Sequence, residues 1–174
     1  LDKFVIDFVK ILEKYIDYIL ISGYVSILFG RSRSTEDVDI FIKKMDKDKF
    51  LRLCKELEKN YWCLNSEDEN EIYDYLNDGL AIRFALKNET IPNFEIKFAI
   101  KYLQKETFKN CLIVETKSGN LKISSLERQI AFKRYYLKSD KDLEDAKHIE
   151  KVFKDNIDYK LIEFYKKMIE NEKT

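Results

Sequence analysis

The sequence predicts an α+β fold, in which a mixed β-sheet flanked by helices is followed by a C-terminal helical segment. Up to residue 123, stretches with helical apolar spacing are interspersed with short runs that alternate apolar and polar residues, as strands do. From residue 124 onward only the helical spacing is found. Because no linker, repeat or low-complexity segment separates these parts, we expect an α+β core at 1–123 and helices packed on it at 124–174, in one compact unit.

The first elements follow from apolar periodicity and from glycine. Residues 4–16 have the spacing of an amphipathic helix, and 18–22 is a short apolar run that Gly23 can end. A short buried helix is expected at 24–29. Residues 37–43 alternate, which places their aspartates on one face of a strand and their branched aliphatic residues on the other.

The remaining elements follow in the same way. Asp46 can cap a helix whose apolar stripe ends at Leu57, and Ser66 can cap a short acidic helix that ends near Gly79. Strands are expected at 61–64, 80–87 and 93–100, and a hairpin at 111–123. The C-terminal helices are expected at 125–137, 141–154 and 158–171.

Composition excludes several classes of protein. Hydrophobic residues make up 45% and aromatic residues 14% of the 174 residues, which is enough to bury a core and argues against disorder. The three cysteines have no CxxC spacing and His148 is the single histidine, so neither a disulfide framework nor a Cys/His zinc site is expected. No apolar stretch is long enough to span a bilayer and no signal peptide is recognised, so we expect a cytoplasmic protein without membrane contact.

The segment GRSRSTEDVDIFI, residues 30–42, contains the pattern that points to chemistry. Alternate residues of a strand point the same way, so Asp37 and Asp39 should present carboxylates a few ångströms apart. Such neighbours repel unless a cation or a proton lies between them, and hard oxygen ligands of this kind suit Mg²⁺ or Mn²⁺. For the pair alone, a polar strand face is the simpler alternative.

The residues before this strand fit a phosphate. Ser22 and Gly23 lie between an expected strand and an expected helix, where backbone N–H groups and the helix dipole can hold a phosphate. Arg31 and Arg33 can add charge-assisted hydrogen bonds to a triphosphate. Each feature alone is commonly structural, because glycine shapes turns and surface arginines are solvated. Their order along the chain, together with the aspartates, favours a nucleotide site.

Two segments resemble a known family. ISGYVSILFGRSRSTEDVDIFI, residues 21–42, resembles the signature of the DNA polymerase β-like nucleotidyltransferases, in which a Gly-Gly or Gly-Ser turn precedes Asp-x-Asp by a short helix. It is most similar to minimal nucleotidyltransferases, including AbiEii-type toxins of type IV toxin–antitoxin pairs. SSLERQIAFKRYYLKSDKDLEDA, residues 124–146, is similar to that group's helical segment, which has a Lys and then a Lys-Asp-x-x-Asp run. The resemblance implies a nucleotidyltransferase-like sheet and transfer of NMP from an NTP.

The resemblance also assigns roles to residues of the first segment. It implies that Asp37 and Asp39 are metal ligands and that Ser22 and Gly23 form the phosphate-holding turn. The turn departs from the family pattern, because the next residue is Tyr24 and not a second small residue. A tighter or altered nucleotide pocket would follow from this departure.

The family further needs a third carboxylate on a neighbouring strand, as a metal ligand and as a base toward the acceptor hydroxyl. Glu95 is the candidate, because in the strand expected at 93–100 it lies opposite the apolar face. The alternative is a Glu95–Lys97 pair on a solvated sheet face. If Glu95 is not the third ligand, Glu89 and Glu115 are next in line.

Lys133 falls in the apolar stripe of the helix expected at 125–137, and a lysine that faces inward needs a partner or a ligand. The resemblance implies that Lys133 binds nucleotide phosphate while Asp142 and Asp145 orient it. A buried Lys133–Asp142 bridge that locks two helices, or a lysine that reaches to water, is the alternative. His148 is expected to be a surface or bridging residue and not a ligand.

The 32 basic and 32 acidic residues cancel in number but not in distribution. Residues 97–141 hold eleven Lys and Arg against four acidic residues, whereas 67–78 hold six acidic residues and no basic one. A positive flank beside the metal site would suit RNA phosphates. Ordinary solvated surface is the alternative and the more common fate of such a run.

The hypothesis from the sequence is therefore a Mg²⁺- or Mn²⁺-dependent nucleotidyltransferase that moves NMP from an NTP to an acceptor hydroxyl. A toxin-like enzyme that acts on RNA ends and has an antitoxin partner is the leading version. Protein hydroxyls and small molecules such as aminoglycosides remain open as acceptors. The competing hypothesis is a catalytically inactive relative that binds a nucleotide or a partner protein.

Overall fold

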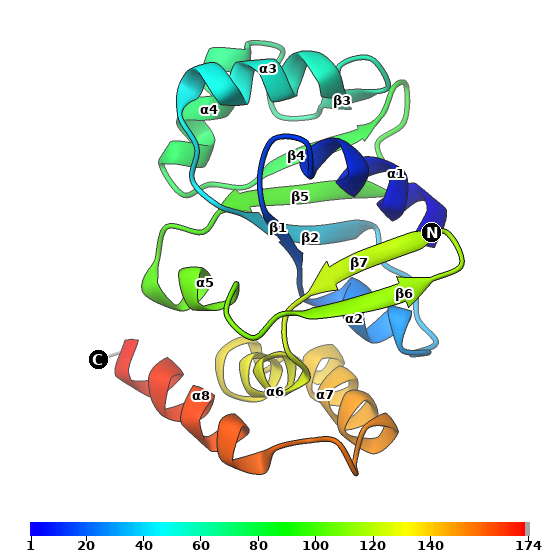
Figure 1. The fold of residues 1–174 in the computed structure, drawn as a ribbon, viewed down its shortest axis with the longest axis vertical. Helices are drawn as coiled ribbons and strands as arrows, with labels where there is room; N and C mark the ends of the chain where they lie inside the picture. The colour runs from blue at the N-terminus through cyan, green and yellow to red at the C-terminus, as the bar shows by residue number, and fades with distance from the viewer. Residues whose placement is uncertain (173–174) are drawn as a thin grey trace.

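The computed structural model describes residues 1–172, and it confirms the predicted α+β class with a seven-stranded sheet and a helical C-terminal segment (Figure 1). The strands are β1 (Tyr18–Leu20), β2 (Asp37–Ile42), β3 (Tyr61–Cys63), β4 (Ile82–Leu86), β5 (Asn93–Phe98), β6 (Leu112–Thr116) and β7 (Gly119–Ile123). The helices are α1 (Asp2–Leu12), α2 (Gly23–Leu28), α3 (Lys47–Leu57), α4 (Glu69–Asn77), α5 (Tyr102–Glu106), α6 (Leu126–Ala131), α7 (Asp140–Val152) and α8 (Tyr159–Glu172), and η1 (Phe132–Leu137) continues α6 in π-helical form. None of the helices described here combines the length and the apolar character that a membrane crossing requires.

The sheet is mixed, as the sequence predicts. Its strand order is β3-β4-β5-β2-β1-β7-β6. β2 pairs with β5 in parallel, as β1 does with β7, and the other neighbours are antiparallel. The register of the parallel β2–β5 pair sets Asp39 beside Glu95, and this register builds the candidate site.

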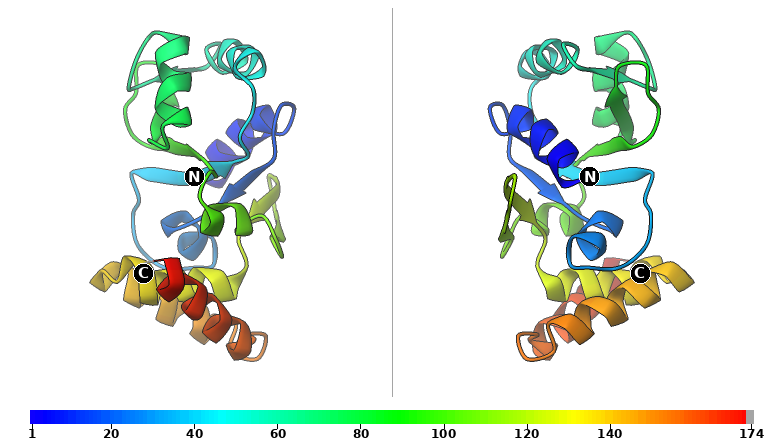
Figure 2. Two further views of the ribbon diagram at one scale, coloured as in Figure 1. Left: turned by 90° about the vertical axis from the view of Figure 1, so that its left-hand side faces the viewer. Right: turned by 90° about the vertical axis from the view of Figure 1, so that its right-hand side faces the viewer.

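Buried side chains form two apolar clusters. In the first cluster, helices α1, α2, α3 and α4 pack against the sheet. In the second, helices α6, α7 and α8 pack together with Leu103 of α5. In Figures 1 and 2 the helices of the second cluster lie together at one end of the molecule, below the sheet. Along β2 buried and half-buried residues alternate, so its aliphatic residues enter the first cluster while its aspartates face away from it.

Several predicted boundaries are wrong. The first helix ends at Leu12 and not at 16, because the chain turns there toward β1. The acidic helix is capped by Asp68, which accepts from the N–H of Asn70, while Ser66 accepts from the N–H of Asp68 one step earlier. The helix expected at 125–137 is divided into α6 and η1, and α5 was not expected at all. Asp46 does cap α3, as predicted.

Candidate functional site

Three carboxylates meet on the face of the sheet that the first apolar cluster leaves free. Asp37 and Asp39 come from alternate positions of β2, and Glu95 comes from the adjacent position of β5. One carboxylate oxygen of each lies within 4.8 Å of the others, and all three side chains are half-buried. Three hard, ionisable oxygen donors at this spacing fit a Mg²⁺- or Mn²⁺-sized cation.

The electrostatics of this cluster favour a cation. Burial and, after it, the negative charges of Asp37 and Glu95 together raise the pKa of Asp39 to about 6, against a hydrogen bond from Ser22 that lowers it. An ionised Asp39 is therefore unfavourable in the protein alone. A divalent cation at the cluster would remove both the repulsion and the desolvation penalty.

Glu95 has partners of its own. Lys97 Nζ lies 3.0 Å from one of its oxygens, and Arg83 of β4 donates to the other at 2.9 Å. Burial alone would raise the pKa of Glu95, but these two cations outweigh burial and lower it. The Glu95–Lys97 pair considered above is thus present, and it coexists with the placement of Glu95 beside the two aspartates. The two cations hold Glu95 ionised and in position.

The turn before α2 is strained and closely packed. Ser22 has φ 62° and ψ −135°, a conformation rarely adopted by residues with a side chain. Gly23 begins α2, and a Cβ atom on it would lie only 2.2 Å from Nη2 of Arg33. Any larger residue at position 23 would displace the guanidinium that covers the turn. Tyr24, the departure from the family pattern, is fully buried and its hydroxyl donates to Asp2 at 2.8 Å, so its ring lies in the core.

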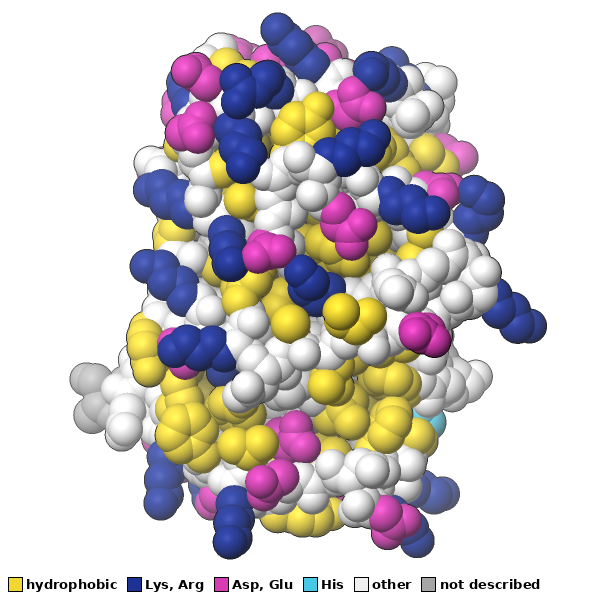
Figure 3. Space-filling view, viewed as in Figure 1, with side chains coloured by type: hydrophobic (Ala, Val, Ile, Leu, Met, Phe, Trp, Pro, Cys, Tyr) yellow, Lys and Arg dark blue, Asp and Glu magenta, His cyan; other side chains and the backbone are white. Residues whose placement is uncertain are grey.

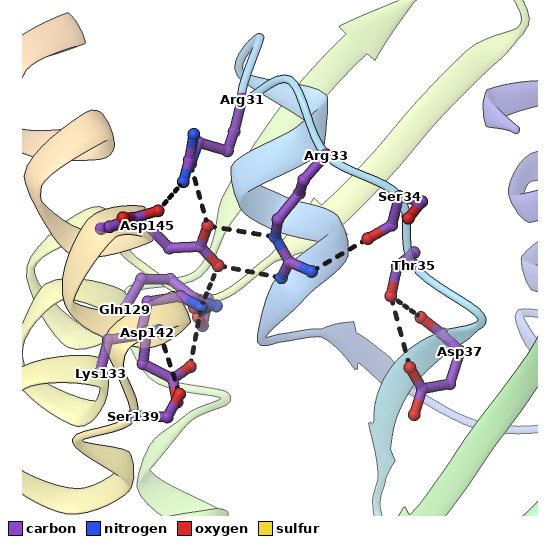
Figure 4. A network of polar contacts seen from close by, with 12 residues as sticks. Arg31, Arg33, Ser34, Thr35, Asp37, Gln129, Lys133, Ser139, Asp142 and Asp145 are labelled. Atoms are coloured by element: carbon purple, nitrogen blue, oxygen red, sulfur yellow. Dashed lines mark hydrogen bonds and ion pairs between the residues drawn. The ribbon is translucent and has the colours of Figure 1, made fainter.

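The two arginines of the segment after α2 reach the C-terminal helices (Figure 4). Arg33 donates from Nε and Nη2 to the two oxygens of Asp145 at 3.1 and 2.9 Å. Arg31 forms an ion pair with Glu144, and its Nε lies 3.5 Å from Oδ1 of Asp145. Both acids belong to α7. The arginines predicted to contact a triphosphate thus connect the core to α7.

Lys133 joins the same network. Its side chain is 1% exposed, and its Nζ lies 2.9 Å from Asp145 and 3.5 Å from Asp142. Asp145 is 0% exposed; burial would raise its pKa, but the hydrogen bonds from Lys133 and Arg33 outweigh it and lower the pKa. The sequence indicated Asp142 as the main partner of Lys133, whereas Asp145 makes the shorter contact and lies at the centre of the network in Figure 4.

A pocket of about 270 Å³ lies between the carboxylate cluster and the C-terminal helices. Asp39 and Ser22 line it at the sheet, and Lys133 and Arg128 line it from η1 and α6. Sequence reasoning missed Arg128, because it lies outside the apolar stripe of its helix and only the packing of α5 and α8 buries it. His148 is not part of the pocket lining; its Nε2 lies 2.9 Å from the carbonyl oxygen of Phe29, and it bridges α7 and the end of α2 as expected.

Comparisons with known proteins support the fold. The sequence matches no protein-family model, and no curated protein matches it significantly. Among solved structures, the crystal structure of ANT(2'')-Ia in complex with adenylyl-2''-tobramycin has a TM-score of 0.60 and 12% identity and covers 99% of both chains. The solution structure of the antibiotic-resistance factor ANT(2'')-Ia has a TM-score of 0.51 and 13% identity, over 94% of this chain and 89% of that one.

A third similar structure is an antigenic nucleotidyltransferase-like protein from Paracoccidioides brasiliensis, with a TM-score of 0.57 and 18% identity over 87% of this chain and 75% of that one. At these identities the likeness is one of fold. The chain therefore has a nucleotidyltransferase-like fold, as the resemblance in its sequence implies. The relation to AbiEii-type toxins stays a prediction.

Proposed function

We propose that this protein is a metal-dependent nucleotidyltransferase that moves NMP from an NTP to an acceptor hydroxyl. The observation that carries the proposal is the cluster of Asp37, Asp39 and Glu95 at the edge of a pocket, within a nucleotidyltransferase-like fold. A solvated polar strand face would not set three carboxylates where burial and their mutual repulsion raise the pKa of Asp39.

The proposed chemistry assigns each residue a task. A divalent ion held by the three carboxylates would neutralise charge that develops on the transferring phosphoryl group. The acceptor oxygen attacks the α-phosphorus of the NTP, the bond to the pyrophosphate oxygen breaks, and the hydroxyl proton passes to Glu95. Lys97 and Arg83 lower the pKa of Glu95, so it is present in the ionised form, which is the form that accepts a proton.

The phosphates of the NTP are proposed to bind at the turn formed by Ser22 and Gly23. Arg33 lies over this turn and Lys133 lines the same pocket, so both cations are within the region that a triphosphate would occupy. Arg31 and Asp142 take part through the α7 network, in which Asp142 helps to hold Lys133 in place.

The direct test is a transfer assay with each of four labelled NTPs, Mg²⁺ or Mn²⁺, and three acceptor pools: total RNA, cell protein and a small-molecule extract. A labelled product that requires the metal and is absent with the Asp37→Asn, Asp39→Asn protein supports an enzyme. NTP binding without any labelled product would favour the inactive nucleotide-binding relative.

Glu95→Gln is expected to lower transfer by on the order of a hundredfold or more and to leave NTP affinity within a few-fold, because a positioned base is lost while the shape is kept. Single-turnover transfer and an NTP titration measure the two effects. Glu89→Gln and Glu115→Gln are matched controls on exposed acids and should have no effect. If transfer is unchanged in Glu95→Gln, Glu95 is not the base and serves only as the ion-pair partner of Lys97 and Arg83.

RNA is a second candidate acceptor, and Lys101 and Lys105 favour it because they are exposed on and beside α5, next to the pocket. The wider positive run is partly neutralised, since five of its eleven cations are ion-paired: Lys97, Lys109, Lys122, Lys133 and Arg134. On the face shown in Figure 3, basic and acidic side chains are interspersed. An RNA-directed toxin with an antitoxin partner stays the biological version of this candidate.

If RNA is the acceptor, its affinity for the protein should depend on salt concentration. RNA affinity is expected to fall steeply as salt rises, and changing Lys101, Lys105 and Lys109 together to Gln should weaken RNA binding without altering NTP affinity. A second triple variant serves as the control, because it removes the same charge from exposed lysines elsewhere: Lys55, Lys87 and Lys154. A flat salt response, or equal losses in the two triple variants, argues against RNA.

A further inference from the structure

Arg128 of α6 is a buried cation that the proposed chemistry does not use. Its side chain is 3% exposed. Nη1 donates to the carbonyl oxygen of Leu103 at 3.3 Å, and the guanidinium lies 4.3 Å from the centre of the Tyr165 ring. Its Nε has no hydrogen-bond partner among the described residues.

Arg128 also forms no ion pair among the described residues, and Glu106 acts on its charge only from beyond ion-pair distance. In the part of the chain that the structure describes, every other fully or largely buried cation pairs with an acid, as Lys133 and Arg33 do, whereas Arg128 makes no ion pair. A neutral carbonyl and an aromatic face compensate a buried charge only in part. Burial accordingly lowers the pKa of Arg128. Such a group is suited to an anion supplied from outside.

Arg128 lines the pocket that begins at Asp39. Two other cations of the lining, Lys97 and Lys133, are neutralised by Glu95 and by Asp145. Lys101 also lines the pocket, and among residues 1–172 it forms no ion pair. Arg128 and Lys101 are therefore the lining cations that form no ion pair among residues 1–172, and Asp39 and Glu172 are the carboxylates of the same lining.

Arg128 and the cation over the proposed phosphate turn are held by different helices, and Ser22 of that turn lines the same pocket as Arg128. Arg33, which covers Gly23, is bound to α7. Arg128 contacts α5 and α8, which lie on the opposite side of α6 from α7 in Figure 1. An anion at Arg128 would share the pocket with Asp39 of the metal cluster and with Ser22 of the turn, and would be held from the α5 and α8 side.

We propose that the acceptor is a small anionic molecule, whose phosphate or carboxylate group binds Arg128 and Lys101 while its hydroxyl lies at the Asp39 and Glu95 end of the pocket. This assignment rests on the proposed function. The pocket of about 270 Å³ admits a small molecule, and the two lining cations without an ion-pair partner favour an anionic group on that molecule.

The first test measures binding and needs no activity. Inorganic phosphate is expected to raise the melting temperature of the wild type, and to raise it again by a similar amount when saturating Mg²⁺–ATP is present. Arg128→Met should lose the phosphate-induced shift, and Lys101→Gln, an exposed change that the fold tolerates, should weaken it. The Asp37→Asn, Asp39→Asn protein should keep it, because the anion lies outside the metal cluster. For each variant, the melting temperature with phosphate is compared with that of the same variant without phosphate. A change in the stability of the variant itself therefore does not affect the comparison.

Three outcomes would overturn the assignment. If Mg²⁺–ATP abolishes the phosphate shift, the anion at Arg128 is a phosphate of the nucleotide. If Arg128→Met keeps the shift while the double aspartate variant loses it, the anion binds at the catalytic cluster. If Arg128→Met and Lys101→Gln both respond to phosphate as the wild type does, there is no anion subsite here.

The second test uses transfer. Labelled product is expected with acceptors such as glucose 6-phosphate or gluconate and not with glucose, tobramycin or RNA. Arg128→Met should raise the KM of the anionic acceptor by on the order of tenfold to a hundredfold, the scale of a charged hydrogen bond, with kcat and NTP affinity within a few-fold. If transfer to tobramycin or RNA is faster than transfer to the anionic small molecules, the proposal of an anionic acceptor is wrong. Absence of transfer to every acceptor, with the phosphate shift intact, would instead contradict the proposed function.

Discussion

Replacing Asp37 and Asp39 together by Asn is expected to abolish nucleotidyl transfer and the rise in melting temperature that Mg²⁺ and an NTP cause. Two of the three ligands of the proposed metal site disappear, and with them the stabilisation of transition-state charge. A loss of several kcal/mol of transition-state stabilisation lowers the rate by on the order of a thousandfold or more. Transfer with labelled NTP and thermal melts with and without Mg²⁺–NTP measure the two effects.

The same variant should fold as well as the wild type in the absence of metal. Ionised Asp39 is unfavourable in the protein, because it is buried beside Asp37 and Glu95. Removing the repelling charges therefore leaves the metal-free melting temperature unchanged or raises it. Equal Mg²⁺–NTP-induced shifts in wild type and variant would contradict the metal assignment.

Asp145→Asn is expected to have the largest effect on stability. Asp145 is fully buried and forms ion pairs with two cations, the buried Lys133 and Arg33. Breaking a buried pair from one side leaves uncompensated charge and costs on the order of 3–5 kcal/mol. Denaturant unfolding measures this cost. Asp142→Asn is the matched control in the same helix and should cost much less, because its contact with Lys133 is longer and more exposed.

The effect of Asp145→Asn should depend on pH. The folded-state pKa of Asp145 is lowered from its ordinary value of 3.8. Its contribution to the free energy of unfolding is therefore complete above that value and is lost as the pH falls through the folded-state pKa. The difference between wild type and variant should be large at neutral pH and should narrow in acid. A difference that is constant with pH would show that the charge of Asp145 does not stabilise the fold.

Lys133→Met separates the two roles considered for this lysine. Asp145 keeps its bidentate contact with Arg33 in this variant, so the loss of stability should be smaller than in Asp145→Asn. If Lys133 contacts nucleotide phosphate, NTP binding weakens by about 1.5–3 kcal/mol. A destabilised protein with unchanged NTP affinity would make Lys133 a structural residue.

The sequence by itself determined the parts of the site that depend on local periodicity. Alternation along residues 37–43 puts Asp37 and Asp39 on one face of a strand, and the same rule puts Glu95 opposite the apolar face of its strand. The order of strands and helices was sufficient for the α+β class. Local rules of this kind act within a few residues and need no knowledge of neighbours.

Only the tertiary structure decided which strands are neighbours and which charges meet. The parallel register of β2 and β5 brings Glu95 beside Asp39 across more than fifty residues of chain. Asp145, and not Asp142, is the central partner of Lys133, because α7 also has to meet Arg33 from the segment after α2. Arg128 gave no signal in the sequence, since its burial depends on α5 and α8 packing around it. Contacts between elements distant in sequence are set by packing of the whole fold, and a local pattern carries no information about them.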